Sequence, residues 1–262
     1  MLSRRKKRRV EYHSKNPYED RINAKTPFAI VESYKIFRTN IQFALATQQG
    51  KAFVISSPTP GDGKSTTAAN LAITLAQTSA RVLLVDADLR KPIQHKIFQV
   101  DNSNGLSRLL IGFETLGESL KRDVEPGLDL LTSGPIPPNP SELLGSQNMS
   151  TFIEKMHQFY DYIIIDSPPI NIVTDSILLA VKCAGLVIVV RQNLTKYDDV
   201  SKTIERAKNA NINILGVVVT DIQTKNKVYK KMKYNYEYGY GYGYGYGYGY
   251  GYNPSQEETT SQ

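Results

Sequence analysis

The chain is poor in cysteine and histidine, and this excludes two kinds of stabilising centre. Its 262 residues include one cysteine, Cys183, and three histidines, His13, His95 and His157. A single cysteine excludes an intrachain disulfide framework and fits a reducing compartment such as the cytoplasm. These four residues show none of the spacings that are typical of zinc ligands, so we expect no zinc site.

Long apolar runs are also missing. The longest have four to five residues, whereas a helix that spans a membrane needs about 20. The basic stretch "RRKKRR" at residues 4–9 is not followed by an apolar stretch, so it is not a secretory signal. We therefore expect neither a membrane span nor secretion.

Positive charge is concentrated at one end of the chain. The formal net charge is +7; residues 4–9 carry six of the 32 Lys and Arg residues, and the other 26 face 25 Asp and Glu residues. A nucleic-acid-binding domain usually spreads a basic face over its folded surface. The distribution therefore argues against a nucleic acid partner. It leaves the basic stretch as a solubilising tail or as a weak contact with anionic lipid.

Short apolar runs alternate with helical patterns over residues 26–222. Buried strands with helices between them predict an α/β fold, in which helices cover both faces of a mostly parallel sheet. In the first helix, Thr26 is the expected N-cap and Pro27 the first helical residue. The expected strands are 51–57, 81–88, 128–134, 162–169, 185–191 and 212–222, and the expected helices are 26–45, 63–77, 175–184 and 197–210.

Three segments differ in composition. Residues 1–25 are polar and charged, and we expect a flexible, basic N-terminal segment. Residues 26–224 are the expected α/β domain. Residues 225–262 begin with lysines and continue as "YEYGYGYGYGYGYGYGY" at 236–252. Because glycine at alternate positions packs nothing and raises the entropic cost of order, we expect this tail to be disordered.

A phosphate-binding loop is indicated by "SSPTPGDGKST", residues 56–66, between an expected strand and an expected helix. Gly63-Lys64-Ser65 is the end of a P-loop, although Pro58 replaces its first glycine. Such a loop binds phosphate through backbone N–H groups and the lysine, and Mg²⁺ through the Ser65 hydroxyl. The alternative is a glycine-rich turn without a ligand. We expect an exposed loop whose nucleotide-binding residues are Pro60, Gly61, Asp62, Gly63, Lys64, Ser65 and Thr66.

Acidic residues end two of the expected strands. "LLVDADLRKP" contains Asp86 and Asp88, and "IIIDSPP" contains Asp166. Carboxylates at the carboxyl ends of parallel strands project into the ligand crevice of such folds. A single acid in this place is often only a loop residue or a helix cap. Together with the P-loop, the three acids suit metal ligation and proton abstraction.

These motifs resemble those of a known family. "SPTPGDGKST", "LLVDADLRKP" and "IIIDSPP" are similar, in this order, to the Walker A, Walker A′ and Walker B motifs of bacterial tyrosine kinases (BY-kinases), which control capsule and exopolysaccharide synthesis. "ESYKIFRTN" at 32–40, "GPIPPNPSELL" at 134–144 and the tyrosine cluster extend the resemblance over residues 26–252. It implies a deviant-Walker P-loop fold, related to partition and division-site ATPases, with ATP and Mg²⁺ as cofactors. The implied activity is that of a non-specific protein-tyrosine kinase, as a cytoplasmic catalytic subunit.

The resemblance also implies residue roles. Lys64 binds phosphates, Ser65 ligates Mg²⁺, and Asp88 and Asp166 organise Mg²⁺ and its waters. Asp86 is the expected base toward the incoming tyrosine, although the residues leave open which of the three acids takes that role. "VVVTD" at 217–221 lacks the asparagine that contacts the base in related ATPases, so the adenine contacts stay unassigned.

One helix carries a motif for self-association. The family pattern Glu-x-x-Arg-x-x-Arg is present as Glu32, Lys35 and Arg38, with lysine in place of the first arginine. The spacing places all three on one helix face, and the resemblance implies a ring-like homo-oligomer. Lysine keeps the charge but loses bidentate geometry. The alternative is an exposed, salt-bridged helix.

The tyrosine cluster is the expected substrate. A disordered row of phenols presents an acceptor in many registers. A flexible tail of about 25 residues is long enough to reach a neighbouring subunit's active site, so we expect autophosphorylation in trans. The alternative is a low-complexity tail used for association. The eleven expected acceptors are Tyr229, Tyr234, Tyr236, Tyr238, Tyr240, Tyr242, Tyr244, Tyr246, Tyr248, Tyr250 and Tyr252.

The resemblance implies two partners and a location. Family members of this length lack a membrane half and work with a transmembrane activator of the chain-length-regulator type, so we expect a cytoplasmic protein held at the inner face of the membrane by that activator. A cognate tyrosine phosphatase is the second partner. Two alternatives remain: a P-loop ATPase switch without kinase activity, and an ATP-binding scaffold of the polysaccharide machinery. The tyrosine tail argues against the first, and the complete set of Lys64, Ser65 and three acids argues against the second.

Overall fold

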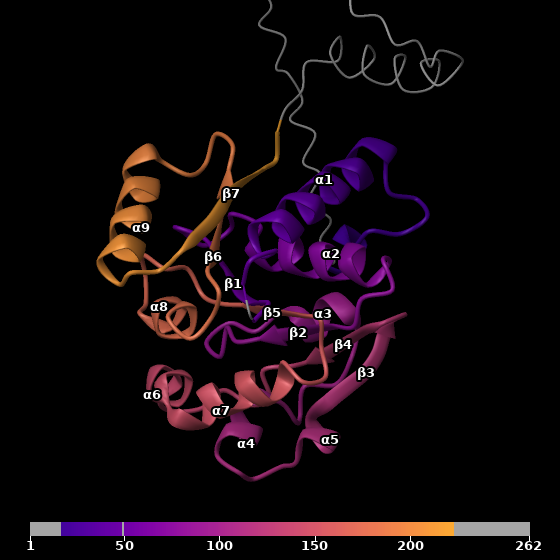
Figure 1. The fold of residues 1–262 in the computed structure, drawn as a ribbon, viewed down its shortest axis with the longest axis vertical. Helices are drawn as coiled ribbons and strands as arrows, with labels where there is room; N and C mark the ends of the chain where they lie inside the picture. The colour runs from indigo at the N-terminus through magenta and orange to yellow at the C-terminus, as the bar shows by residue number, and fades with distance from the viewer. Residues whose placement is uncertain (1–16, 49, 223–262) are drawn as a thin grey trace, which may run out of the picture. The chain divides into compact units, whose positions relative to one another are not determined.

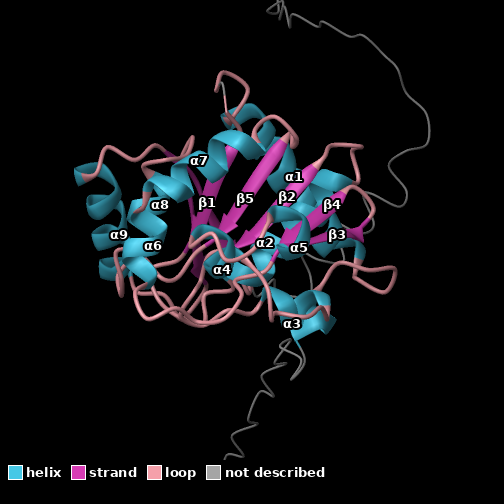
Figure 2. Cartoon of the chain, turned by 90° about the horizontal axis from the view of Figure 1, so that it is seen from below, coloured by secondary structure: helices cyan, strands magenta, loops and turns pink. Residues whose placement is uncertain are grey.

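The described strands form one sheet in the order β3-β4-β2-β5-β1-β6-β7. The computed structural model describes residues 17–48 and 50–222. β3 runs antiparallel to β4, and the other neighbouring pairs are parallel. Figure 2 shows β1, β5, β2, β4 and β3 side by side. The strands are β1 Ala52–Ser56, β2 Val82–Asp86, β3 Leu120–Glu125, β4 Leu128–Leu131, β5 Tyr162–Asp166, β6 Leu186–Arg191 and β7 Ile214–Thr220.

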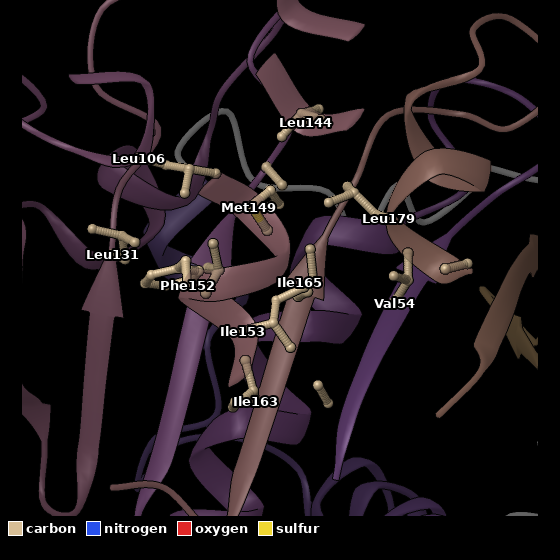
Figure 3. Packing of buried hydrophobic residues seen from close by; sticks show 14 of the residues in the cluster. Val54, Leu106, Leu131, Leu144, Met149, Phe152, Ile153, Ile163, Ile165 and Leu179 are labelled. Carbon is tan, nitrogen blue, oxygen red and sulfur yellow. The ribbon is translucent and has the colours of Figure 1, made fainter. Parts of the chain in front are cut away.

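Helices lie on both faces of this sheet, as predicted, and each face has its own core. One core joins α1, α2 and α3 to the strands, with α1 lying along α2 (Figure 1). The other lies under α4 and α6 to α9. In the second core, Met149, Phe152 and Ile153 of α7 lie against Ile163 and Ile165 of β5 (Figure 3). The helices are η1 Pro17–Asp20, α1 Phe28–Ala44, α2 Lys64–Ala76, α3 Gln94–Phe98, α4 Leu106–Leu110, α5 Leu116–Ser119, α6 Pro140–Gly145, α7 Gln147–Met156, α8 Asp175–Ala180 and α9 Tyr197–Asn209.

The central strands are fully buried because both of their faces are covered. All five residues of β1, β2 and β5 are buried, which is why these segments are continuous apolar runs instead of alternating ones. The antiparallel edge strand β3 was not predicted, since its sequence LKRDVE is mostly charged and partly exposed. In the part of the chain that the structure describes, no helix is both long and apolar enough to cross a membrane.

The start of α1 differs from the prediction. Pro27 is the N-cap, and its carbonyl accepts the N–H groups of Ile30 and Val31. The Thr26 hydroxyl accepts the N–H of Asn23 instead (2.9 Å). The prediction that Thr26 caps this helix is therefore wrong by one residue, because its side chain closes the preceding turn.

Residues 17–25 pack on the domain, so the predicted flexible segment extends too far into the chain. The Asn70 side chain on α2 accepts the N–H of Ile22 (2.8 Å) and donates to the Asp20 carbonyl (3.0 Å). Arg21 pairs with Glu125 of β3 at 3.2 Å. The folded part therefore begins before residue 26. Residues 1–16, with the basic stretch, and residues 223–262, with the predicted tail boundary, lie outside the described residues.

Strand order brings the predicted motifs to one edge of the sheet. β5 lies between β2 and β1, and the register pairs Asp86 with Asp166 and Ile55 with Asp166. The two acids therefore end neighbouring parallel strands, and the P-loop follows the third strand, β1. Ligands of open parallel sheets bind at such a point, where the strand order reverses.

Candidate functional site

The P-loop has the backbone of an anion-binding turn. Gly61 and Gly63 have φ of +87° and +91°, a conformation that favours glycine. Gly63 is the N-cap of α2, whose first turn contains no acidic residue. Among the described hydrogen bonds, the N–H groups of residues 61–66 donate to no protein atom. Free N–H groups at a helix N-terminus are a ready site for phosphate oxygens.

The loop is held from outside by side chains of the β6–α9 connection and β7. Asp62 is fully buried; its carboxylate accepts the Thr59 N–H (3.0 Å) and the Thr195 hydroxyl (2.7 Å). Thr220 of β7 donates to the Asp62 carbonyl at 2.8 Å, and Arg191 donates to the Gly61 carbonyl at 3.2 Å. The Asp62 side chain therefore anchors the loop, so that any contact of Asp62 with phosphate would come from its backbone.

Lys64 lies at the centre of the predicted acids. Its Nζ is 2.9 Å from Asp88 Oδ2, 3.4 Å from Asp166 Oδ1 and 3.0 Å from the Ser65 hydroxyl. The Lys64 side chain is only 12% exposed, so the expectation of an exposed lysine is wrong: α2 begins at this residue and the side chain is enclosed by the carboxylates. The structure thus brings Lys64, Ser65, Asp88 and Asp166 together.

Asp86 adjoins this group but faces the backbone that follows it. One oxygen accepts the N–H groups of Ile93 (3.1 Å) and Gln94 (2.9 Å), and the other accepts the Asp88 N–H at 3.3 Å. Its side chain is fully buried. Asp86 therefore folds residues 88–94 over the end of β2, while Asp88 Oδ1 accepts the Lys91 N–H in the same loop (3.0 Å).

Burial shapes the charges of the site. Burial raises the pKa of Asp86 to about 8, and the neighbouring Asp166 adds to the rise. Burial also raises the pKa of Asp166, against the pull of Lys64. For Lys64, burial opposes the charge, but Asp166 and Asp88 outweigh it, so the pKa of Lys64 is raised. Three acidic side chains thus gather around one ammonium group, and their raised pKa values show that the site favours additional positive charge, as bound protons or as a cation.

Two residues of the site were not predicted. Gln94, the first residue of α3, is fully buried, and its amide donates to Asp166 Oδ2 (2.8 Å) and to the Ser65 carbonyl (3.0 Å). Arg90 binds the buried Asp175 at the start of α8 through Nε (2.8 Å) and Nη2 (3.2 Å). Arg90 stands inside the quoted run "LLVDADLRKP", which could have drawn attention to it. Nothing in the sequence marks Gln94.

The predicted self-association motif is divided between two environments. Lys35 pairs with Glu32 at 2.7 Å, and both side chains are partly exposed. Arg38 instead donates to the Thr74 carbonyl of α2 at 2.9 Å. Glu32 and Lys35 are thus available at the surface of α1, whereas Arg38 joins α1 to α2. The eleven predicted phosphoacceptor tyrosines all lie outside the described residues.

The residues present fit a magnesium nucleotide. Lys64, the free N–H groups of the loop and the Ser65 hydroxyl suit phosphate and Mg²⁺, and the excess of carboxylates suits a divalent cation. Among the described residues, no group of three or more His, Cys, Asp or Glu side chains could hold a metal ion. Mg²⁺ is usually bound by one or two carboxylates together with waters and substrate phosphates, and this donor set matches that arrangement.

Comparison with known proteins identifies what the chain as a whole resembles. A family model described as an AAA domain matches residues 50–217. Tyrosine-protein kinase YwqD of Bacillus subtilis is 42% identical over 188 residues, which cover 72% of this chain and 79% of YwqD. Some longer tyrosine-protein kinases also match, and the chain spans 25–27% of their length.

Solved structures show the same fold. The kinase domain of the Escherichia coli tyrosine kinase ETK is 32% identical, with a TM-score of 0.70, over 82% of this chain and 80% of that domain. The septum site-determining protein MinD of Pyrococcus horikoshii, solved with Mg-ADP, has a TM-score of 0.57 at 23% identity over 65% of this chain and 70% of MinD. The second likeness concerns the fold alone, and it agrees with the predicted α/β fold with helices on both faces of a mostly parallel sheet.

Proposed function

This chain belongs to the family of bacterial tyrosine-protein kinases, and we propose that it transfers the γ-phosphoryl group of ATP to the tyrosines of its own C-terminal cluster. The observation that carries the proposal is the group formed by Lys64, Asp88 and Asp166 beside a P-loop with free N–H groups. We propose that this autophosphorylation regulates capsular or exopolysaccharide synthesis and export.

The proposed roles follow from the contacts. Mg-ATP, when bound, supplies the phosphoryl group and the cation that balances the carboxylates. Lys64 holds charge at the phosphate side of the loop, and Ser65, Asp88 and Asp166 orient the metal and its waters. Phosphoryl transfer depends mainly on such positioning and charge neutralisation.

Proton acceptance from the tyrosine belongs to the carboxylate group. A pKa of about 8 lies close enough to neutral pH for a general base, once Asp86 has given up the proton that it holds in the nucleotide-free chain. Its two oxygens, however, are engaged by backbone N–H groups. If Asp86 is the base, as the family resemblance implies, the loop of residues 88–94 must move during the reaction. If Asp86 instead stays bound to this loop throughout the reaction, Asp88 is the residue that accepts the proton.

The test is mass spectrometry of the full chain after incubation with Mg-ATP and an activator peptide. We expect phosphotyrosine mainly within residues 229–252. Lys64→Met should lower its formation by ~100-fold or more, as for the loss of one preorganised charge at a transition state. Lys155→Met, at an exposed position of α7, is the matched control and should behave like wild type. Phosphate only on Ser or Thr, or equal labelling of the Lys64 variant, contradicts the proposal.

We propose a homo-oligomer in which tails are modified in trans. Its support is the exposed pair of Glu32 and Lys35 on α1, together with the nearby exposed apolar side chains Phe28, Ile36 and Phe43. Light scattering of wild type and of the double variant Glu32→Ala/Lys35→Ala measures the assembly. A mass that is the same for both proteins would remove this pair from the interface.

We propose that a transmembrane chain-length regulator activates the kinase through its cytosolic tail and holds it at the inner face of the membrane, and that a tyrosine phosphatase resets the cycle. This part rests on the family resemblance and on the long relatives, of which the chain spans about a quarter. Titration of the regulator's cytosolic peptide into the kinase should raise tail phosphorylation. A rate that does not change at saturating peptide contradicts the activator proposal.

A P-loop ATPase switch without kinase activity is the remaining candidate, because the fold is shared with MinD. The same experiment separates the two functions: ATP hydrolysis without any phosphotyrosine favours the switch.

A further inference from the structure

Gln94 connects three parts of the nucleotide site that come from distant positions in the chain. Its side-chain nitrogen donates to Asp166 Oδ2 at the end of β5 (2.8 Å) and to the Ser65 carbonyl in the first turn of α2 (3.0 Å). Its backbone N–H donates to Asp86 at the end of β2 (2.9 Å). One residue therefore fixes the relative positions of β2, β5 and the P-loop helix.

The amide nitrogen of Gln94 makes two hydrogen bonds, whereas the amide oxygen makes none. Gln94 is fully buried, and Oε1 has no hydrogen-bond partner. A buried polar atom without a partner destabilises a fold by about 1–3 kcal/mol, and it often marks a functional group. Both hydrogens of the amide nitrogen are used, so the amide cannot turn its oxygen toward a donor without releasing Asp166 or Ser65.

The bond to Gln94 distinguishes the two oxygens of Asp166. Oδ2 is held by the amide, while Oδ1 faces the Lys64 ammonium group at 3.4 Å. The carboxylate thus has one orientation, with one oxygen directed to the charged centre of the site. A residue that fixes a carboxylate near a metal in this way usually changes metal affinity when it is replaced.

We propose that Gln94 is a positioning residue for Mg²⁺: it holds Asp166 so that Oδ1 is presented to the cation that accompanies the nucleotide. The proposal rests on the proposed function, because it assumes a Mg-nucleotide beside Lys64 and Ser65. It assigns no chemical step to Gln94, which touches Asp166 and the Ser65 backbone and neither the nucleotide nor the acceptor tyrosine.

The side chain can be tested separately from the backbone. Gln94→Leu removes the amide and its unpaired oxygen but keeps the backbone N–H bond to Asp86, so the start of α3 is preserved. Gln94→Asn keeps an amide that is one methylene shorter and does not reach both acceptors. Asn171→Leu is the matched control, because the Asn171 amide also donates to a carbonyl (Asp199, 2.8 Å) and also leaves its buried oxygen without a partner.

The measurement is the affinity of the full-length chain for ADP, with Mg²⁺ and with EDTA, by calorimetry. The ratio of the two dissociation constants gives the contribution of Mg²⁺ without any phosphoryl transfer. We expect Gln94→Leu to reduce this ratio by ~10-fold or more, as for other outer-shell partners of metal ligands. Gln94→Asn should reduce it less, and Asn171→Leu should leave it unchanged. ADP affinity in EDTA should stay within about twofold in all three variants.

Thermal melting of the nucleotide-free proteins distinguishes positioning from general destabilisation. Gln94→Leu also leaves the buried Asp166 Oδ2 without its donor, so we expect a melting temperature moderately below that of wild type, partly offset by removal of the unpaired oxygen. An unchanged Mg²⁺ ratio in both Gln94 variants, or a loss that follows melting temperature alone, overturns the proposal and leaves the kinase function standing. A wild-type chain whose ADP binding does not respond to Mg²⁺ would overturn the proposed site and the role of Gln94 together.

Discussion

Two buried carboxylate groups lie at the same edge of the sheet and differ in how their charge is balanced. In the first, Asp88 and Asp166 contact the single ammonium group of Lys64, and the buried Asp86 lies beside them. In the second, Asp175 alone is bound by Arg90 at 2.8 and 3.2 Å and by the Ser141 hydroxyl at 2.6 Å. The first group is short of positive charge, and the second is complete.

The difference separates a binding site from a structural contact. The completed pair joins the loop after β2 to α6 and α8, and its two charges balance each other. The incomplete group raises the pKa of Asp86 to about 8 through burial and through Asp166, and a cation would relieve this. Buried charge alone therefore does not indicate function; the charge that stays unbalanced does.

The largest effect should come from pH acting on the incomplete group. The pKa of Asp86 is about 8 in the folded chain and 3.8 ordinarily. Unfolding therefore releases a proton between about pH 4 and 8, and the stability of the nucleotide-free chain should fall as pH rises through this range. At ~1.4 kcal/mol per pKa unit, the upper limit is several kcal/mol. Asp86→Asn should flatten the dependence of melting temperature on pH.

The control for Asp86 is a carboxylate with the opposite shift. The Arg81 N–H lowers the pKa of Asp161, which lies far from the nucleotide site on the surface. Asp161→Asn should keep the wild-type fall in stability between pH 5 and 8. If the stability of Asp86→Asn falls between pH 5 and 8 as much as that of wild type, Asp86 is not the source of the charge imbalance in the group around Lys64.

Breaking the completed pair should have the next largest effect. Arg90→Ala leaves the fully buried Asp175 with Ser141 only. We expect a loss of about 2–3 kcal/mol in the free energy of unfolding, below the ~3–5 kcal/mol for wholly buried pairs, because the Arg90 side chain is 38% exposed. Urea denaturation measures it.

Two further variants serve as controls for Arg90→Ala. Arg81→Ala breaks a pair whose side chains are 64% and 44% exposed, and it should change stability by at most about 0.5 kcal/mol. The double variant Arg90→Met/Asp175→Leu removes both charges and should be more stable than Arg90→Ala. A single and a double variant of equal stability would show that Asp175 is not left unbalanced.

The smallest effect is expected at Asp62, a carboxylate held by neutral groups. Thr195→Val removes the hydroxyl that donates to Asp62 (2.7 Å) and accepts the Arg191 N–H (2.7 Å). We expect a loss of about 1–2 kcal/mol, because a buried acceptor loses one partner. Thr195→Ser keeps the hydroxyl and should stay close to wild type in thermal melting. Equal losses in both variants would show that the methyl group contributes as much as the hydroxyl and would contradict this prediction.

The sequence predicts features that arise within one continuous segment. β1, β2 and β5 were found because burial on both faces makes them uninterrupted apolar runs, and Asp86 and Asp166 because they end such runs. The P-loop was found from Gly63-Lys64-Ser65. Features that join distant segments were missed. Gln94 binds Asp166, 72 positions further along the chain, and Arg90 binds Asp175, 85 positions further along. No pattern within one segment predicts such a contact.

Edge elements were the other weakness. β3 pairs on one side only, and its buried and exposed residues do not alternate, so its charged sequence carries no strand signal. The helices α3 to α6 have four to six residues, too few to show a helical period. The side chain of Asp62 could not be placed either, since its partner Thr195 is 133 positions away.

The position of β5 between β2 and β1 has a consequence for the order of folding. Ser167 donates to the Ile55 carbonyl although the two residues are 112 positions apart. A chain still being synthesised has made the P-loop and Asp86 well before the strand that must lie between them. Closing so long a loop is slow compared with forming local helices. We therefore expect that nucleotide binding appears late in refolding, together with hydrogen-exchange protection of β5, and that a nascent chain ending before β5 does not bind ATP.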